Sequence, residues 1–448
     1  MKQLLHSAGP HLVAALGERA FAAISSTLSS LSSPVDVVEL APTPLGTGAG
    51  DTSKGNPVLA VATSLTSNGT KLLVAAARQD KTLALYSIDL ASLSAAKTEK
   101  SAMGMARPTT VYKTHKRVGS LLFATVPGKS LEALDVLIAG DFEGSVIAYP
   151  IPSLDAEVPG ENVSRLLLGH TTSILTGLRM VKGADGNSKI LTSDNDEKVR
   201  VSSFPNTFIV EGYLLGHTDC VTSLDAATDA SCPYCVTCGG DGTIRLWNYL
   251  SFEQIALIEI EIEEERGSDD DKKIPTSVGM SADGSIIVVS WHGSNFADVY
   301  KVTKCDGASA SLQKIQALEC PQQPLVVAFL TDGSLCFLAK DPAYLMRFEP
   351  TRNDAGEITS FLSVTDACGM CTSLKEIGAA GNIDMPASIL EEDDLTGKLA
   401  LRRKMDNVQD VRKKEWNNIK RKEINKNRNI RRKKRQRERA QLDKSETN

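Results

Sequence analysis

The amino-acid sequence of 448 residues predicts an all-β fold, a seven-bladed β-propeller with a basic, helical C-terminal tail. Two stretches of the chain nearly repeat each other, and short apolar runs alternate with polar turns over much of its length. Charge is divided unevenly: residues 402–448 hold 19 Lys and Arg against seven Asp and Glu, although the whole chain holds 50 against 55. An acidic body with a basic arm is common in proteins that contact nucleic acid.

The two repeated stretches each define one blade. Leu167-Leu168-Gly169-His170 precedes Asp196-Glu197-Lys198-Val199-Arg200-Val201, and Leu214-Leu215-Gly216-His217 precedes Asp241-Gly242-Thr243-Ile244-Arg245-Leu246-Trp247. The second stretch has the signature of a WD (WD40) repeat, and the 47 residues from His170 to His217 match the usual period of such blades. Because one repeat cannot bury its apolar faces alone, the pattern predicts a ring of stacked blades.

Weaker copies of the pattern, each with apolar strands around a polar turn, predict further blades at 11–27, 72–86, 136–149, 285–302 and 325–348. We expect about seven blades of ~50 residues between residues 1 and 375. Residues 360–364 are a candidate strand to complete a blade begun near the N-terminus. Residues 376–401 are then a linker, and the acidic insertion 259–273 separates two blades.

Polar residues at matching places predict a structural hydrogen-bond network in each clear blade. One network is expected to contain His217, Asp241, Thr237 and Trp247; the other is expected to contain His170, Asp196 and either Thr192 or Ser193. A buried polar network is stable only when every member has a partner, so a structural role is favoured over a catalytic one. Ser202 stands where the stronger blade has Trp247, which predicts a less rigid blade over residues 167–203.

Lys198 and Arg200 are the candidate partner-binding residues. Positions i and i+2 of a strand face the same side, so these two residues present two positive charges together, just after a turn at the propeller rim. An ordinary solvated pair is one interpretation of this pattern. A contact with an acidic partner is the other.

Residues 193–202 read Ser-Asp-Asn-Asp-Glu-Lys-Val-Arg-Val-Ser, and Phe204-Pro205 and Leu215-Gly216-His217-Thr218 follow. This pattern resembles the WD-repeat, non-catalytic subunit of tRNA (guanine-N7)-methyltransferase. The resemblance implies a scaffold with no catalytic residues and no cofactor, because a separate catalytic subunit binds S-adenosylmethionine and methylates N7 of a guanine in the tRNA variable loop. It also implies that the scaffold stabilises this subunit, helps to position tRNA, and meets acidic groups of the subunit through Lys198 and Arg200.

The tail over residues 402–448 is predicted to be helical, or partly disordered when alone, because apolar residues recur at spacings of three and four without Gly or Pro. Its densest cluster consists of Arg431, Arg432, Lys433, Lys434, Arg435 and Arg437. Three interpretations stay open: binding of tRNA phosphates, a nuclear localisation signal that places the protein in the nucleus, or a solvated charged arm.

Other kinds of site find no support. Cys232, Cys235 and Cys238 lie on one predicted strand, where residues three apart face opposite sides and cannot close a tetrahedral zinc site. The six histidines show no metal or triad spacing, and no phosphate-binding loop is present. No run of ~20 apolar residues predicts a membrane span. Two rival functions remain, a substrate receptor of a ubiquitin ligase and a WD factor of ribosome assembly.

Overall fold

The structure is a computed structural model. It describes residues 3–364 except 9–10, 17, 25–35, 43–55, 67, 92–103, 127–135, 153–163, 172, 260–273, 305–309 and 340–344. The predicted linker, the predicted tail with its basic cluster, and nearly all of the acidic insertion lie outside the described residues. A search of the described part finds no helix with the length and hydropathy that crossing a membrane requires.

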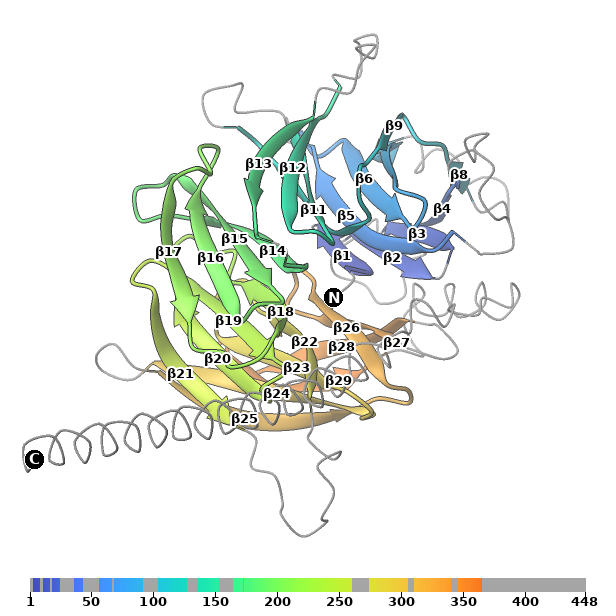
Figure 1. Ribbon diagram of the computed structural model, residues 1–448. Coiled ribbons are helices and arrows are strands. Elements are labelled where there is room, and N and C mark those ends of the chain that lie inside the picture. The colour runs from blue at the N-terminus through green and yellow to red at the C-terminus, as the bar shows by residue number, and fades with distance from the viewer. Residues whose placement is uncertain are drawn as a thin grey trace, which may run out of the picture. The chain divides into compact units, whose positions relative to one another are not determined.

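The described strands form seven sheets, which we number as blades in chain order (Figure 1). Blade 1 contains β1 (Leu5–Ala8), β2 (His11–Leu16), β3 (Arg19–Ile24) and β4 (Asp36–Leu40), with β8 (Gly104–Ala106) added in parallel to β4. Blade 2 contains β5 (Val58–Leu65), β6 (Lys71–Arg78), β7 (Thr82–Asp89) and β9 (Thr110–Lys113). Blade 3 contains β10 (Val118–Ala124), β11 (Val136–Asp141), β12 (Ser145–Pro150) and β13 (Arg165–Gly169).

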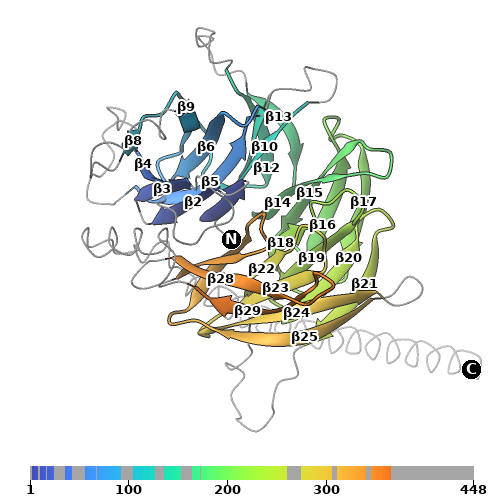
Figure 2. The ribbon, with the colours of Figure 1, turned by 180° about the vertical axis from the view of Figure 1, so that it is seen from behind.

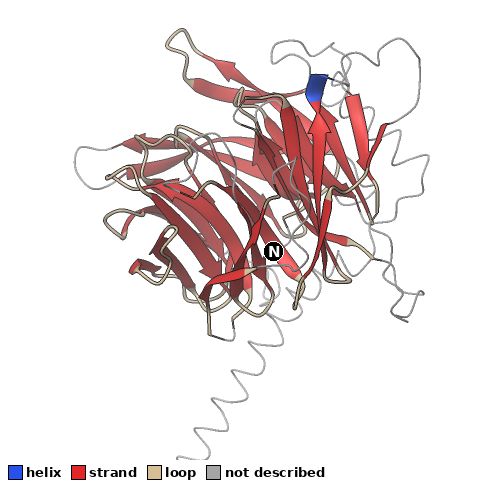
Figure 3. Ribbon diagram, turned by 90° about the horizontal axis from the view of Figure 1, so that it is seen from above, coloured by secondary structure: helices blue, strands red, loops and turns tan. Residues whose placement is uncertain are grey.

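Blades 4 to 7 are four-stranded meanders of consecutive strands. Blade 4 contains β14 (Leu175–Lys182), β15 (Ser188–Asp194), β16 (Lys198–Ser203) and β17 (Val210–Leu215). Blade 5 contains β18 (Val221–Ala226), β19 (Tyr234–Gly239), β20 (Thr243–Asn248) and β21 (Glu253–Glu259). Blade 6 contains β22 (Pro275–Met280), β23 (Ile286–Trp291), β24 (Phe296–Lys304) and β25 (Ala310–Glu319). Blade 7 contains β26 (Pro324–Phe329), β27 (Leu335–Ala339), β28 (Leu345–Arg352) and β29 (Ile358–Ser363). The predicted all-β, seven-bladed propeller is confirmed, and Figure 3 shows how completely strands dominate it.

The first strands of successive blades contact one another around a ring, which closes where β1 meets β26. At this junction the Ser7 hydroxyl donates a hydrogen bond to the Phe329 carbonyl at 2.7 Å. The first strand of a blade is also an edge strand, and side chains of the preceding blade accept some of its backbone N–H groups. Asp225, for example, accepts from the Met280 N–H at 2.9 Å.

The expectation that residues 360–364 complete an N-terminal blade is wrong. Instead β29 pairs antiparallel with β28, so blade 7 is built wholly from the C-terminal side of the propeller (Figure 2). The physical reason is the tight turn between these strands. The Asn353 side chain accepts the Glu357 N–H at 2.9 Å, and Gly356 adopts a left-handed φ of 79°, so the chain folds straight back on itself.

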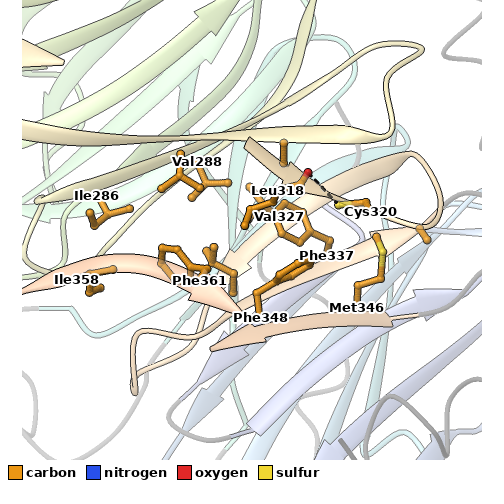
Figure 4. Packing of buried hydrophobic residues seen from close by; sticks show 14 residues of the cluster. Ile286, Val288, Leu318, Cys320, Val327, Phe337, Met346, Phe348, Ile358 and Phe361 are labelled. Atoms are coloured by element: carbon orange, nitrogen blue, oxygen red, sulfur yellow. Dashed lines mark hydrogen bonds between the residues drawn. The ribbon is translucent and has the colours of Figure 1, made fainter. Parts of the chain in front are cut away.

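The core lies between the blades. Figure 4 shows one cluster of buried side chains, contributed by blades 6 and 7, in which Phe337 and Phe348 make an edge-to-face contact with ring centroids 5.6 Å apart. The other clusters likewise draw on neighbouring blades. Each sheet therefore buries apolar side chains against its neighbours, and its polar functional groups are left to the turns and the outer strands.

Candidate docking surface and its supporting networks

The predicted network of blade 5 is present in full. His217 Nδ1 lies 3.0 Å from Oδ2 of Asp241, and His217 Nε2 lies 2.7 Å from Oγ1 of Thr237. The Trp247 indole N–H donates to the same Thr237 oxygen at 2.8 Å. One arrangement of protons satisfies all four groups: Nδ1–H donates to the carboxylate, and the Thr237 hydroxyl donates to Nε2 while it accepts from the indole. The network joins the loop before β18 to strands β19 and β20.

The network of blade 4 uses a different carboxylate from the one predicted. His170 Nδ1 lies 2.7 Å from Oδ2 of Asp194, and His170 Nε2 lies 2.8 Å from Oγ1 of Thr192. The prediction that Asp196 would pair with His170 is therefore wrong. The two candidate hydroxyls are also separated, because Thr192 contacts the histidine whereas Ser193 contacts Thr176.

The alignment of blades 4 and 5 explains why their networks use carboxylates from different positions. The turn after β15 and the turn after β19 match, since Glu197 and Gly242 both adopt a left-handed φ, of 72° and 81°. Asp196 thus corresponds to Asp241, and Asp194 corresponds to Gly239. A Cβ at Gly239 would lie 2.6 Å from Nδ1 of His217, so a side chain at this strand position points directly at the histidine. Blade 4 places its carboxylate there, and the turn aspartate is not needed.

Ser202 stands where blade 5 has its tryptophan, and its hydroxyl contacts Arg200, accepting from Nε at 3.0 Å. Thr207, in the connection between β16 and β17, is 1% exposed and donates from its hydroxyl to the Leu167 carbonyl of blade 3. The β16–β17 connection is therefore attached to the neighbouring blade. The prediction that blade 4 is less rigid stays a prediction.

Lys198 and Arg200 face the same side of β16, as predicted, because the alternate residues Val199 and Val201 are fully buried in the core shared with blade 5. Lys198 is exposed, whereas Arg200 is half-buried. The Arg200 guanidinium donates to the carbonyls of Gly169 at 3.4 Å and Thr207 at 3.3 Å. Among the described residues no carboxylate forms an ion pair with either side chain. The pair therefore consists of one accessible ammonium group and one guanidinium that connects blades 3 and 4.

Exposed apolar residues, which were not predicted from the sequence, lie beside this pair. Tyr213 lies opposite Arg200 and Leu215 lies opposite Lys198 across the β16–β17 ladder, and both apolar side chains are exposed. In the sequence, β17 reads Val-Glu-Gly-Tyr-Leu-Leu, without a regular alternation of apolar and polar residues. Its outward face could not be identified there, because either face of a strand can be the buried one.

Cys235 and Cys238 lie on β19, as predicted, whereas Cys232 precedes the strand and was wrongly placed on it. Cys235 packs in the core between blades 4 and 5, and Cys238 packs in the core between blades 5 and 6, so they occupy opposite faces of one sheet. Burial raises the pKa of the Cys238 thiol to about 12, which keeps it protonated and unreactive. Within the described part of the chain no three His, Cys, Asp or Glu side chains form a group that could hold a metal ion.

Replacement of Asp194 should separate the observed network from the expected one. We expect Asp194→Asn to lower the free energy of unfolding by about 1–3 kcal/mol, because the buried His170 loses its charged acceptor. Asp196→Asn should change it by less than ~0.5 kcal/mol, because its carboxylate has no hydrogen-bond partner among the described residues. Urea unfolding followed by circular dichroism measures both. Equal losses would contradict the assignment of Asp194.

A pH dependence follows from Asp241. Burial alone would raise its pKa, but the hydrogen bonds from His217 and from the N–H groups of Thr218 and Thr243 outweigh burial and hold the pKa well below its ordinary value of 3.8. The unfolded chain then binds a proton more readily than the folded chain. We expect the stabilisation to be complete above pH 3.8 and to be lost as the pH falls through the lower folded-state pKa. Urea unfolding across this range should show a shallower pH dependence for Asp241→Asn than for the wild type, and identical slopes would contradict the claim.

Part of this chain is similar in sequence to known proteins. Residues 156–361 match the family model described as the tRNA methyltransferase TRM82 WD40 domain. The chain is 28% identical over 265 residues to the tRNA (guanine-N(7)-)-methyltransferase non-catalytic subunit wuho of Aedes aegypti, covering 58% of this chain and 57% of that protein. It is 31% identical over 198 residues to the subunit TRM82 of Saccharomyces cerevisiae, covering 44% of this chain and 38% of that protein. The chain thus spans less than two thirds of the length of either relative.

Among solved structures, a chain in a crystal structure of a mitotic checkpoint complex aligns with a TM-score of 0.51 and 18% sequence identity, over 76% of this chain and 84% of that chain. At this identity the match supports the propeller fold alone. Both curated relatives are named as non-catalytic subunits, in line with the expectation that this chain is not the enzyme. The resemblance read from residues 193–218 is confirmed: residues 156–361 are similar to the TRM82 family of WD40 domains, and both relatives are named as non-catalytic subunits of tRNA (guanine-N7)-methyltransferase.

Proposed function

We propose that this chain is the non-catalytic scaffold of a tRNA (guanine-N7)-methyltransferase complex. It forms a heterodimer with the catalytic subunit, which binds S-adenosylmethionine, and it helps to position tRNA so that N7-methylguanosine forms in the variable loop. The family match over residues 156–361 carries this proposal, because it includes the segment that holds Lys198 and Arg200. The chain itself would need no cofactor.

The charges around the docking surface support the same proposal. Lys198 is exposed at the start of β16, immediately after a tight turn, and no described carboxylate forms an ion pair with it. A partner with acidic side chains would supply the missing counter-charge. Charge pairs that become desolvated at an interface can couple by several kcal/mol, whereas pairs at an exposed rim contribute little. Lys198 is therefore the residue proposed to contact the catalytic subunit directly.

Arg200 contributes to the same surface from a more buried position. Its guanidinium already bonds to the Gly169 and Thr207 carbonyls, so it fixes the boundary between blades 3 and 4. Carbonyl contacts leave its positive charge without neutralisation, and an acidic partner would still be attracted to it. Reversal of its charge would affect both binding and the local structure, which makes Lys198 the cleaner position to test.

We expect Lys198→Glu to weaken co-purification with the catalytic subunit by at least about tenfold, and the double change with Arg200→Glu to abolish it. The readout is affinity purification from the native organism followed by mass spectrometry. Lys113→Glu, an exposed strand lysine of blade 2, is the matched control. Unchanged recovery of the methyltransferase would refute the role of Lys198. Recovery of cullin adaptors or ribosomal precursors in its place would favour one of the rival functions.

The tail outside the described residues is proposed to bind tRNA phosphates, to direct the chain to the nucleus, or to do both. We expect deletion of residues 402–448 to leave the propeller folded. The deletion should weaken tRNA binding and lower its salt dependence, since each lost phosphate contact removes about 0.9 from the slope of log affinity against log salt. Gel-shift titrations at several salt concentrations and imaging of a fluorescent fusion measure the two effects. A truncated chain that unfolds, or that keeps both properties, would contradict the proposal.

A further inference from the structure

Exposed apolar side chains gather on one short segment of blade 4. Twelve large hydrophobic residues are exposed in the described part of the chain, and five of them fall between residues 208 and 215. We call these five residues the apolar strip: Phe208 is 75% exposed, Ile209 53%, Val210 38%, Tyr213 43% and Leu215 65%. Contiguous exposed apolar surface is uncommon on monomeric proteins and typically marks an interaction site.

Two residues of the strip, Tyr213 and Leu215, lie on the same face of the sheet as the basic pair. Across the β16–β17 ladder, Leu215 is opposite Lys198 and Tyr213 is opposite Arg200. Directly opposed residues of an antiparallel ladder have Cβ atoms about 4.5–5.5 Å apart and share a face. Leu214, which points to the other face, is buried in the core shared with blade 5. Tyr213 and Leu215 therefore form one continuous surface with Lys198 and Arg200, and the other three residues of the strip precede them along the chain.

The backbone that carries the strip is held in place on both sides. Lys189 forms an ion pair with Glu211, and the Ser203 hydroxyl donates to the same carboxylate at 2.6 Å. A Cβ at Gly212 would lie 2.7 Å from the Phe252 ring, so the strand packs directly against blade 5. These contacts leave Phe208 and Leu215 exposed on a fixed framework, which reduces the entropy lost when a partner binds.

The N-terminal end of the strip is fixed as well. Thr207, next to Phe208, bonds to the Leu167 carbonyl of blade 3. The Ile209 carbonyl accepts the Ser203 N–H at 3.0 Å, and its own N–H donates to the Asn206 carbonyl at 3.1 Å. Phe208 is thus exposed at a tight turn whose backbone is held by hydrogen bonds.

We infer that the apolar strip is the hydrophobic centre of the surface that binds the catalytic methyltransferase subunit. This inference rests on the proposed function and adds the chemistry of the contact. The partner segment presents apolar side chains to Phe208 and Leu215, at the two ends of the strip, and a carboxylate to Lys198 next to Leu215. In protein interfaces a few buried apolar and aromatic anchors supply most of the affinity, whereas charges at the edge govern encounter rate and orientation.

Two other occupants fit the surface less well. Single-stranded RNA binds through aromatic stacking beside positive charge, and Phe208 and Tyr213 could supply it, but the other three residues of the strip are aliphatic and offer no aromatic face to a base. A second copy of the chain, docked by the same surface around a two-fold axis, would bring like charges together at Lys198 and Arg200. A protein surface with both acidic and apolar side chains matches the apolar strip as well as the basic pair.

The test measures binding of the purified full chain to the purified catalytic subunit by titration calorimetry at two salt concentrations. We expect Phe208→Ser and Leu215→Ser each to weaken binding at least about tenfold at both salt concentrations. Lys198→Glu should weaken binding more at low salt, because salt screens charge pairs at an interface edge. Leu362→Ser is the matched control, since Leu362 is 63% exposed on β29 of blade 7, and it should bind as the wild type does.

Each outcome separates this inference from the function on which it rests. If the wild-type chain does not bind the catalytic subunit, the proposed function is refuted. If the wild type binds, Lys198→Glu weakens it, and both strip variants bind normally, only the present inference is overturned. The inference is also overturned if Phe208→Ser lowers tRNA affinity of the isolated chain without weakening subunit binding, or if it dissolves a homodimer seen by light scattering while subunit binding is unchanged.

Discussion

The constraint that governs this molecule is that each blade has two apolar faces and can bury them only against two neighbours. Cys235 and Cys238 illustrate it within a single strand, since one thiol packs toward blade 4 and the other toward blade 6. A stack of such sheets has unsatisfied faces at its ends unless it closes. The contact of β1 with β26, fixed by the Ser7–Phe329 hydrogen bond, removes those ends. Within the described propeller, the surfaces left for a partner are therefore turns, outer strands and boundaries between blades.

Polar networks connect the strands within a blade to the loop that precedes its first strand. Blades 4 and 5 solve the same problem with different residues, because a histidine before the first strand needs a carboxylate and a hydroxyl within hydrogen-bond distance. Blade 5 takes the carboxylate from its turn, at Asp241, while blade 4 takes it from the strand end, at Asp194. What is preserved is the position of the charge relative to the imidazole ring. Residue identity at any one place in the repeat matters less.

The departures of blade 4 from the repeat all lie close to its exposed surface. With Ser202 in place of a tryptophan, Arg200 bonds to the serine and to two carbonyls, and the buried Thr207 attaches the β16–β17 connection to blade 3. This connection carries Phe208 outward, and β17 continues with Tyr213 and Leu215 beside the basic pair. An internal network without a tryptophan is thus accompanied by a surface that is both charged and apolar. That combination is what a specific protein partner requires, because charge alone is easily screened and apolar area alone does not discriminate.

The sequence by itself determined the propeller, the family resemblance, the blade 5 network and the shared face of Lys198 and Arg200. These features depend on local pattern: a period near 47 residues, the two-residue alternation of strands, and tight turns with a residue that accepts a left-handed conformation.

Tertiary structure alone decided three other features. Asp194 pairs with His170 in place of Asp196 because the folded strand brings the Asp194 carboxylate closer to the imidazole, which spacing along the chain does not reveal. Residues 358–363 complete blade 7 because the turn at Asn353–Gly356 pairs them with the strand just before. The apolar strip is exposed because its strand lies at the outer edge of a sheet, and which face of that strand is covered depends on neighbouring blades that no local pattern records.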